Sequence, residues 1–231
     1  QEVLSVADFA TYDGVTDDTT KVTQAVAEAV ARGTDLYWPD GSALTTANIP
    51  LLHTVRHRGP GAIVRGSDTF YPDPTSGRTN TLYLAASGGS SSNDGLTASQ
   101  PIDTLTNIWA AVANYGPHLA GKWKLQHAAG TYSGYHRVPY QLTSEKMVEL
   151  LGPDVSGHPN VPTAIYDNNA AANKVVSCIN AGMKIKVKDI KVRECESTGI
   201  EMSGGLLFCE NVHTLDCEIG IGCYGGDLYV S

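Results

Sequence analysis

Acidic side chains in the C-terminal part of the chain have types and spacings that suit general acid–base catalysis, in which one group donates a proton and another accepts one. The candidates are Glu196, Asp216 and Glu218. Asp216 and Glu218 lie two residues apart, on the same side of an extended strand. Glu196 and Glu218 each follow a cysteine, so they would stack if their segments form neighbouring strands about 4.8 Å apart. Such acids, which here also include Glu194, Glu201, Glu210 and Asp227, can equally form an ordinary solvated surface.

Basic and aromatic side chains in the same region could bind a ligand. Lys186 and Lys188 alternate with Ile185 and Val187, so a strand here would hold the lysines outside and the apolar residues inside. A row of outward lysines could bind an acidic ligand, or it could simply keep the strands soluble and their edges unpaired. Tyr224 lies in a glycine-rich turn and is the best candidate for an exposed aromatic contact.

Short strands separated by turn residues follow one another from Glu145 onward. The segment GIEMSGG at 199–205 matches GIGCYGG at 220–226, and Cys195-Glu196 matches Cys217-Glu218 one residue out of phase. A period of about 21 to 22 residues is typical of one three-strand turn of a parallel β-helix. Each turn of such a solenoid pairs with its neighbours through backbone hydrogen bonds, so similar residues stack.

The first part of the chain carries one pattern twice. DGVTDD at 13–18 and DGLTAS at 94–99 each supply an Asp-Gly turn and residues that can cap a helix. Helices are therefore predicted over about 20–32 and 105–115, with Gly33 ending the first. Alternating residues also predict short strands at 52–56 and 62–65.

Both copies resemble the first turn of right-handed parallel β-helix proteins of the pectate-lyase-like superfamily, in which a helix covers the open end of the solenoid. Besides the Asp-Gly turns, the residues that carry the resemblance are VADF at 6–9, LYWPDGS at 36–42, LYLA at 82–85 and GTY at 130–132. The resemblance implies a mainly β fold, a right-handed parallel β-helix with helix-capped N-terminal modules. The expected division is a first module at 1–75, a second at 76–140 and β-helix turns at 141–231.

A β-helix with two such modules resembles a bacteriophage tailspike or tail fibre. The resemblance implies a homotrimer of the virion tail that binds a bacterial surface polysaccharide, capsule or O-antigen, during host attachment. It also implies other tail proteins as partners, and depolymerisation of the polysaccharide by hydrolysis or elimination. Hydrolysis uses two carboxyl groups, for which the three acids above are candidates, and the two lysines and Tyr224 would contact the polysaccharide. The alternative is a non-catalytic structural or adaptor segment of a tail fibre.

Composition and missing motifs exclude several other classes. The formal net charge of −8 argues against nucleic-acid binding. The sequence contains no run of about 18 apolar residues that would predict membrane insertion. It also contains no phosphate-loop, dinucleotide or metal-binding motif that would point to a cofactor or metal. The five cysteines lack close pairing, so we interpret them as small buried hydrophobes of a protein assembled in the reducing host cytoplasm. This spacing and the absence of a secretion signal also count against a secreted lyase.

Overall fold

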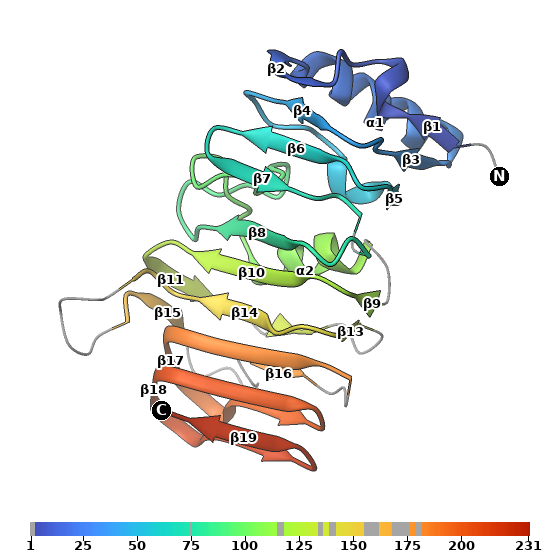
Figure 1. Ribbon diagram of the computed structural model, residues 1–231. Helices are drawn as coiled ribbons and strands as arrows, with labels where there is room; N and C mark the ends of the chain where they lie inside the picture. The colour runs from blue at the N-terminus through green and yellow to red at the C-terminus, as the bar shows by residue number, and fades with distance from the viewer. Residues whose placement is uncertain are drawn as a thin grey trace.

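The protein folds mainly into β-strands that stack from the N-terminus to the C-terminus (Figure 1). The computed structural model describes residues 3–73, 75–114, 118–133, 136–138, 142–154, 162–167, 176–178 and 182–231. Strand pairing is parallel throughout this part of the chain, except between β6 (Ala62–Arg65) and β7 (Asp68–Phe70), which pair antiparallel. The prediction of a mainly β protein is therefore confirmed, and one of the sheets curls into a half-barrel.

Among the described residues, two small sheets lie at the N-terminal end, and a third lies near the middle of the stack. One contains β1 (Val3–Ser5), β3 (Asp35–Tyr37) and β5 (His57–Arg58), and another contains β2 (Asp13–Asp17), β4 (Ser42–Leu44), β6 and β7. A third pairs β9 (His118–Leu119) with β13 (Thr143–Ser144). A short 3-10 helix, η1 (Val6–Asp8), follows β1.

A ten-stranded sheet forms the rest of the described stack, and its strands join into three parallel ladders. The first ladder runs through β8 (Thr79–Leu84), β10 (Lys122–His127), β14 (Val148–Leu151), the beginning of β17 (Lys184–Ser203), the beginning of β18 (Leu206–Tyr224) and β19 (Asp227–Val230). The second runs through β11 (Gly130–Ser133), β15 (Ala164–Asp167) and the middle of β17 and β18. The third runs through β12 (His136–Arg137), β16 (Val176–Cys178) and the end of β17 and β18.

The register between β17 and β18 confirms the sequence repeat. Cys195 pairs with Cys217, 22 positions later, whereas Ile200 pairs with Ile221, 21 positions later. The one-residue change of phase falls at the register shift between Cys195 and Thr198. The alternating apolar residues Ile185, Val187, Ile190 and Val192 of β17 are buried, and so are the side chains of Cys195 and Cys209. On β18, in contrast, Leu215 and Ile219 are 47% and 42% exposed.

Both predicted helices form. Helix α1 (Thr19–Arg32) ends at Gly33, which adopts the left-handed conformation with φ 60°. The backbone N–H of Gly33 donates to the backbone oxygens of Ala29 and Val30. The apolar stripe of the helix is formed by Val22, Ala25, Val26 and Ala29, which are buried. The side chain of Asp18 before the helix accepts hydrogen bonds from the backbone of Thr11 and Tyr12 and does not cap the helix. Helix α2 (Leu105–Asn114) matches the second prediction, although Tyr115 lies outside the described residues.

The predicted strand at 52–56 is wrong, because Leu52–Thr54 forms the 3-10 helix η2. Leu51 before it adopts a left-handed backbone with φ 63°, which breaks the extended path. Leu52 and Val55, which are three residues apart, are both buried in the core, as the three-residue turn of a 3-10 helix allows. The other predicted strand, at 62–65, is β6.

One continuous apolar core crosses both predicted module boundaries. An ion pair buried between the first two modules adds a polar link: Arg65 and Asp94 meet through two hydrogen bonds of 2.8 Å, with side chains 6% and 0% exposed. Asp94 also accepts the backbone N–H of Ile49 at 2.8 Å. The described parts of residues 1–75 and 76–140 therefore pack against each other through shared buried contacts.

Candidate functional site

The outward side chains of the first ladder form a surface that we call the outer face. One column of this face holds Lys124, Glu149, Lys186, Phe208 and Tyr229, which are neighbours in successive strands. The register places these side chains on one side of the sheet because each ladder partner shares the same pleat. Charged and aromatic groups from strands far apart in sequence are thus brought side by side.

The next column of the outer face holds Gln126, Leu151, Lys188 and Glu210. Gln126 donates a hydrogen bond from its side-chain amide to the backbone oxygen of Gly152 at 2.9 Å. This bond fixes the amide beside the turn that follows β14. A hydrogen-bonding side chain that the sequence motifs did not reveal therefore belongs to this surface.

Ion pairs offset the lysine charges on the outer face. Glu210 binds both Lys186 and Lys188, the latter at 2.5 Å. Hydrogen bonds from the two lysines lower the pKa of the Glu210 carboxyl, and the hydrogen bond that Lys188 donates to Glu210 raises the pKa of Lys188. Glu149 likewise binds Lys122 at 2.7 Å. The predicted row of outward lysines is therefore partly neutralised, because Lys186 and Lys188 share the carboxylate of Glu210.

A groove of about 510 Å³ opens between these columns and the turn beside them. It is lined by Gln126, Glu149, Leu151, Gly152, Asp154, Lys186, Lys188 and Asp189. Two of the predicted ligand-binding residues, Lys186 and Lys188, thus lie together in a concave site. The groove also holds the carboxylates of Glu149, Asp154 and Asp189, none of which was singled out from the sequence.

The turn beside the groove has a strained and regular backbone. Asp189 and Asn211 both adopt positive φ values, 55° and 49°, which are uncommon for residues other than glycine. Asn211 donates a side-chain hydrogen bond of 2.7 Å to Asp189, so successive turns are linked at this corner. The same corner begins at Gly152, whose N–H binds the backbone oxygen of Lys188 at 2.8 Å.

We expect Gly152→Ala to lower the free energy of unfolding by about 1–3 kcal/mol, the range of overpacking substitutions. A Cβ at this position would lie 1.8 Å from the backbone oxygen of Asp189, so the corner must shift. Urea denaturation measures the effect, with Gly66→Ala as a control because the surrounding space there is open and only its φ of 60° is strained. An equal loss of stability in Gly152→Ala and Gly66→Ala would show that the close contact at Gly152 does not cause the destabilisation.

A stacked aromatic pair extends the outer face beyond the groove. The rings of Phe208 and Tyr229 lie 4.6 Å apart between centroids and are nearly parallel, at 12°. Tyr229 is 53% exposed, so part of its ring is accessible to a ligand. Offset stacking of this kind fixes the ring orientation.

The predicted catalytic acids lie elsewhere. Glu196, Asp216 and Glu218 are exposed at the corner that follows the second ladder, so the segment Ile190–Arg193 separates them from Lys188 and the groove. Asp216 has a left-handed backbone with φ 52°. The structure therefore groups these acids near one corner but does not join them to the lysines, and their catalytic role stays a prediction.

Tyr224 is also remote from the groove. It pairs in register with Ser203 at the end of the third ladder, and its side chain is exposed as expected. The predicted ligand-binding set is thus divided between two surfaces, with the two lysines on the outer face and Tyr224 at the far end of β18. A ligand contact by Tyr224 remains a prediction.

Within the described residues, no group of three or more His, Cys, Asp or Glu side chains is arranged to hold a metal ion. Over the same residues, neither α1 nor α2 is long and apolar enough to span a membrane. Comparison of the chain with family models, curated proteins and solved structures found no match.

Proposed function

We propose that this protein binds a bacterial surface polysaccharide along its outer face, as part of a bacteriophage tailspike. The groove that gathers Gln126, Glu149 and the two lysines beside an exposed aromatic stack is the observation that supports this proposal. Sugar hydroxyls accept and donate hydrogen bonds to such side chains, while the apolar face of a sugar ring packs on an aromatic ring. Because the carboxylate of Glu210 pairs with the two lysines, the surface suits a hydroxyl-rich polymer better than a strong polyanion.

The proposed framework is a right-handed parallel β-helix closed at its N-terminal end by α1. Three consecutive parallel ladders between β17 and β18, with a repeat of 21 to 22 residues, support this proposal. Side chains of neighbouring turns then stack about 4.8 Å apart, which provides a rigid and regular surface for an extended polymer. A homotrimer in the virion tail, contacts with other tail proteins and assembly in the host cytoplasm belong to the same proposal and rest on the family resemblance.

Cleavage of the bound polysaccharide is the enzymatic form of the proposal. Hydrolysis requires two carboxyl groups near the scissile bond, and Glu149 and Asp154 both line the groove. We therefore add these two residues to Glu196, Asp216 and Glu218 as candidate catalytic acids. If the protein shortens a polysaccharide, Glu149→Gln should abolish cleavage and retain binding. If cleavage is lost only when Glu196, Asp216 or Glu218 is replaced, the reaction takes place at that corner instead.

A non-catalytic structural segment of a tail fibre is the second candidate function. The observation that favours it is the ion pairing of Glu210 with Lys186 and Lys188, which links neighbouring strands and gives these lysines a structural role. In that case the isolated chain would bind another tail component and no glycan. The two candidate functions therefore predict different binding partners, a polysaccharide for the first and a tail protein for the second.

Lys188→Ala is expected to weaken binding of the cognate polysaccharide about tenfold, the effect of losing one hydrogen bond to a charged group. Lys188 lines the groove, whereas Lys191, three residues later on β17, lies on the second ladder. Titration calorimetry with both variants provides the comparison, and Lys191→Ala should bind like the native chain. Equal losses in the two variants would contradict the assignment of the groove as the binding site.

A further inference from the structure

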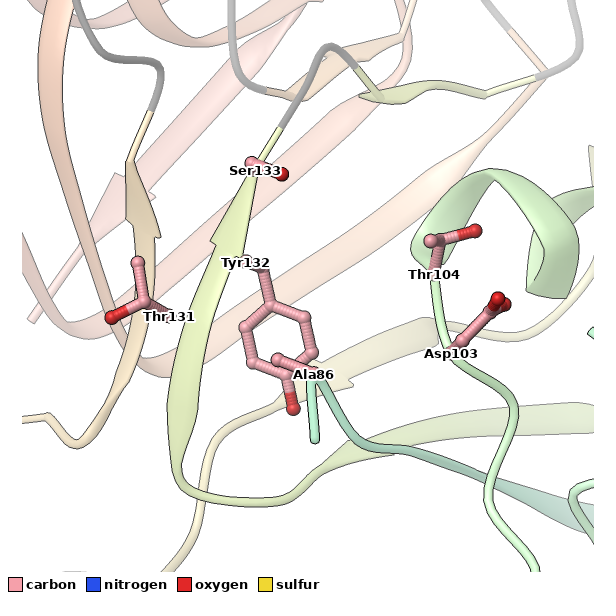
Figure 2. A pocket seen from close by; sticks show the side chains of 6 residues that line it. All are labelled: Ala86, Asp103, Thr104, Thr131, Tyr132 and Ser133. Atoms are coloured by element: carbon pink, nitrogen blue, oxygen red, sulfur yellow. The ribbon is translucent and has the colours of Figure 1, made fainter. Parts of the chain in front are cut away.

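A second cavity, of about 250 Å³, lies at the free edge of the second ladder. Figure 2 shows Tyr132 and Ser133 of β11 on one side, and Asp103 and Thr104 at the beginning of α2 on the other. Ala86 and Thr131 complete the lining. This volume is below the range of about 300–1,000 Å³ for drug-sized ligands, so the cavity suits one small molecule.

The strand that lines this cavity offers backbone as well as side-chain groups. Within the described sheet, β11 is the end strand of its ladder, and Gly130 directs its N–H toward β15. Because backbone groups alternate along a strand, those of Thr131 and Ser133 point to the opposite edge, where the cavity lies. The hydroxyls of both residues add further hydrogen-bonding groups.

Fixed neighbours hold the shape of the cavity. The hydroxyl of Tyr132 donates to the backbone oxygen of Ala128 at 2.8 Å, and its ring stacks on Tyr166 with centroids 5.2 Å apart. On the opposite wall, Asn107 donates its side-chain amide to one Asp103 carboxylate oxygen at 2.7 Å and its backbone N–H to Thr104 at 3.2 Å. Both walls are therefore positioned before any ligand binds.

The charge of the cavity selects the class of ligand. Among the described residues that line it, Asp103 alone is charged, and the other polar groups are hydroxyls. A carboxylate with neighbouring hydroxyls favours a protonated amine and disfavours an anion. We propose that this cavity binds a small hydroxylated amine the size of one amino-sugar ring, at a site separate from the outer-face groove.

Three rings of similar size test the proposal because they differ mainly in charge: glucosamine, glucose and glucuronate. We expect glucosamine, at slightly acidic pH, to shift the amide NMR signals of Asp103, Thr104 and Thr131–Ser133 in the full chain. The expected dissociation constant is about 1–10 mM, as for other weak single-ring ligands. Glucose should bind several-fold more weakly, and glucuronate should leave these signals unchanged.

Two variants make the test specific. Asp103→Asn should remove the preference for glucosamine over glucose, whereas Asp8→Asn, an exposed carboxylate outside the cavity, should retain it. Ala86→Phe should block all binding by filling the cavity, and it should leave the melting temperature unchanged because Ala86 is exposed. Equal binding of the three rings, no shift at these amides, or shifts that persist in Ala86→Phe would overturn the proposal. Lys188→Ala should not affect glucosamine binding, which separates this site from the groove.

Discussion

Replacing Asp94 by alanine is expected to lower the free energy of unfolding by about 3–5 kcal/mol, the usual cost of breaking a buried ion pair. The substitution leaves the Arg65 guanidinium without its carboxylate partner in a site where it is 6% exposed. It also removes the acceptor for the backbone N–H of Ile49. Because this pair joins the two predicted modules, we expect both to unfold together at lower denaturant concentration.

Urea denaturation of Asp94→Ala and of Glu28→Ala gives the decisive comparison. Glu28 forms an exposed i,i+4 pair with Arg32 on α1, so its loss should cost at most about 1 kcal/mol. The double variant Arg65→Met/Asp94→Leu should recover much of the lost stability, because it removes the unpaired charge. A cost at Asp94 no greater than that at Glu28 would contradict the role assigned to the buried pair.

Mild acid is expected to destabilise the protein through its buried histidines. Burial lowers the pKa of His57 and of His127 to about 4, from the ordinary 6.5. Between these values the unfolded chain binds protons that the folded chain does not, so stability is full above about pH 6.5 and falls as the pH decreases toward 4. Each histidine then accounts for a loss of about 3 kcal/mol. The Asp17 carboxyl, whose pKa is lowered to about 2 by hydrogen bonds from Thr19 and Thr46, titrates below this window.

Hydrogen bonds explain why His57 stays neutral. One ring nitrogen accepts the indole N–H of Trp38 at 2.9 Å, and the other donates to the backbone oxygen of Leu52 at 2.7 Å. If the ring were protonated, the N–H at Nδ1 of His57 would face the indole N–H of Trp38, and the hydrogen bond between them would be lost. Denaturation at neutral pH and at about pH 4.5 should therefore show a smaller acid loss in His57→Gln than in the native chain. An unchanged loss would mean that other groups dominate the acid response.

The sequence predicts the helices and the repeat because their signals are local. The apolar stripe and Gly33 define α1 within one short segment, and the match between residues 199–205 and 220–226 defines one turn. The Asp94-Gly95 turn was also predicted, because an Asp-Gly pair is itself a turn signal. In the structure Gly95 adopts the positive φ, 66°, that such a turn favours. The partner of Asp94 was not, because Arg65 lies 29 residues away with no pattern that relates the two.

The outer-face groove could be predicted only in part, for the same reason. Lys186 and Lys188 stood out because alternation along one strand reveals which side chains face outward. Glu149 and Gln126 come from earlier turns, which are separated from β17 by connections of unequal length. No single period relates them, so only the three-dimensional register shows that these residues share one face.

Exposure of the purified protein to a panel of capsular and O-antigen polysaccharides is the most direct test of the central claim. Binding, chain length, reducing ends and unsaturated products should be followed together, in the native chain and in Lys188→Ala. Saturable binding of one polymer that weakens in Lys188→Ala is the predicted result, and shortening of that polymer would add a depolymerase activity. Binding to none of the polymers, together with specific binding to another tail protein, would contradict the claim and establish the structural alternative.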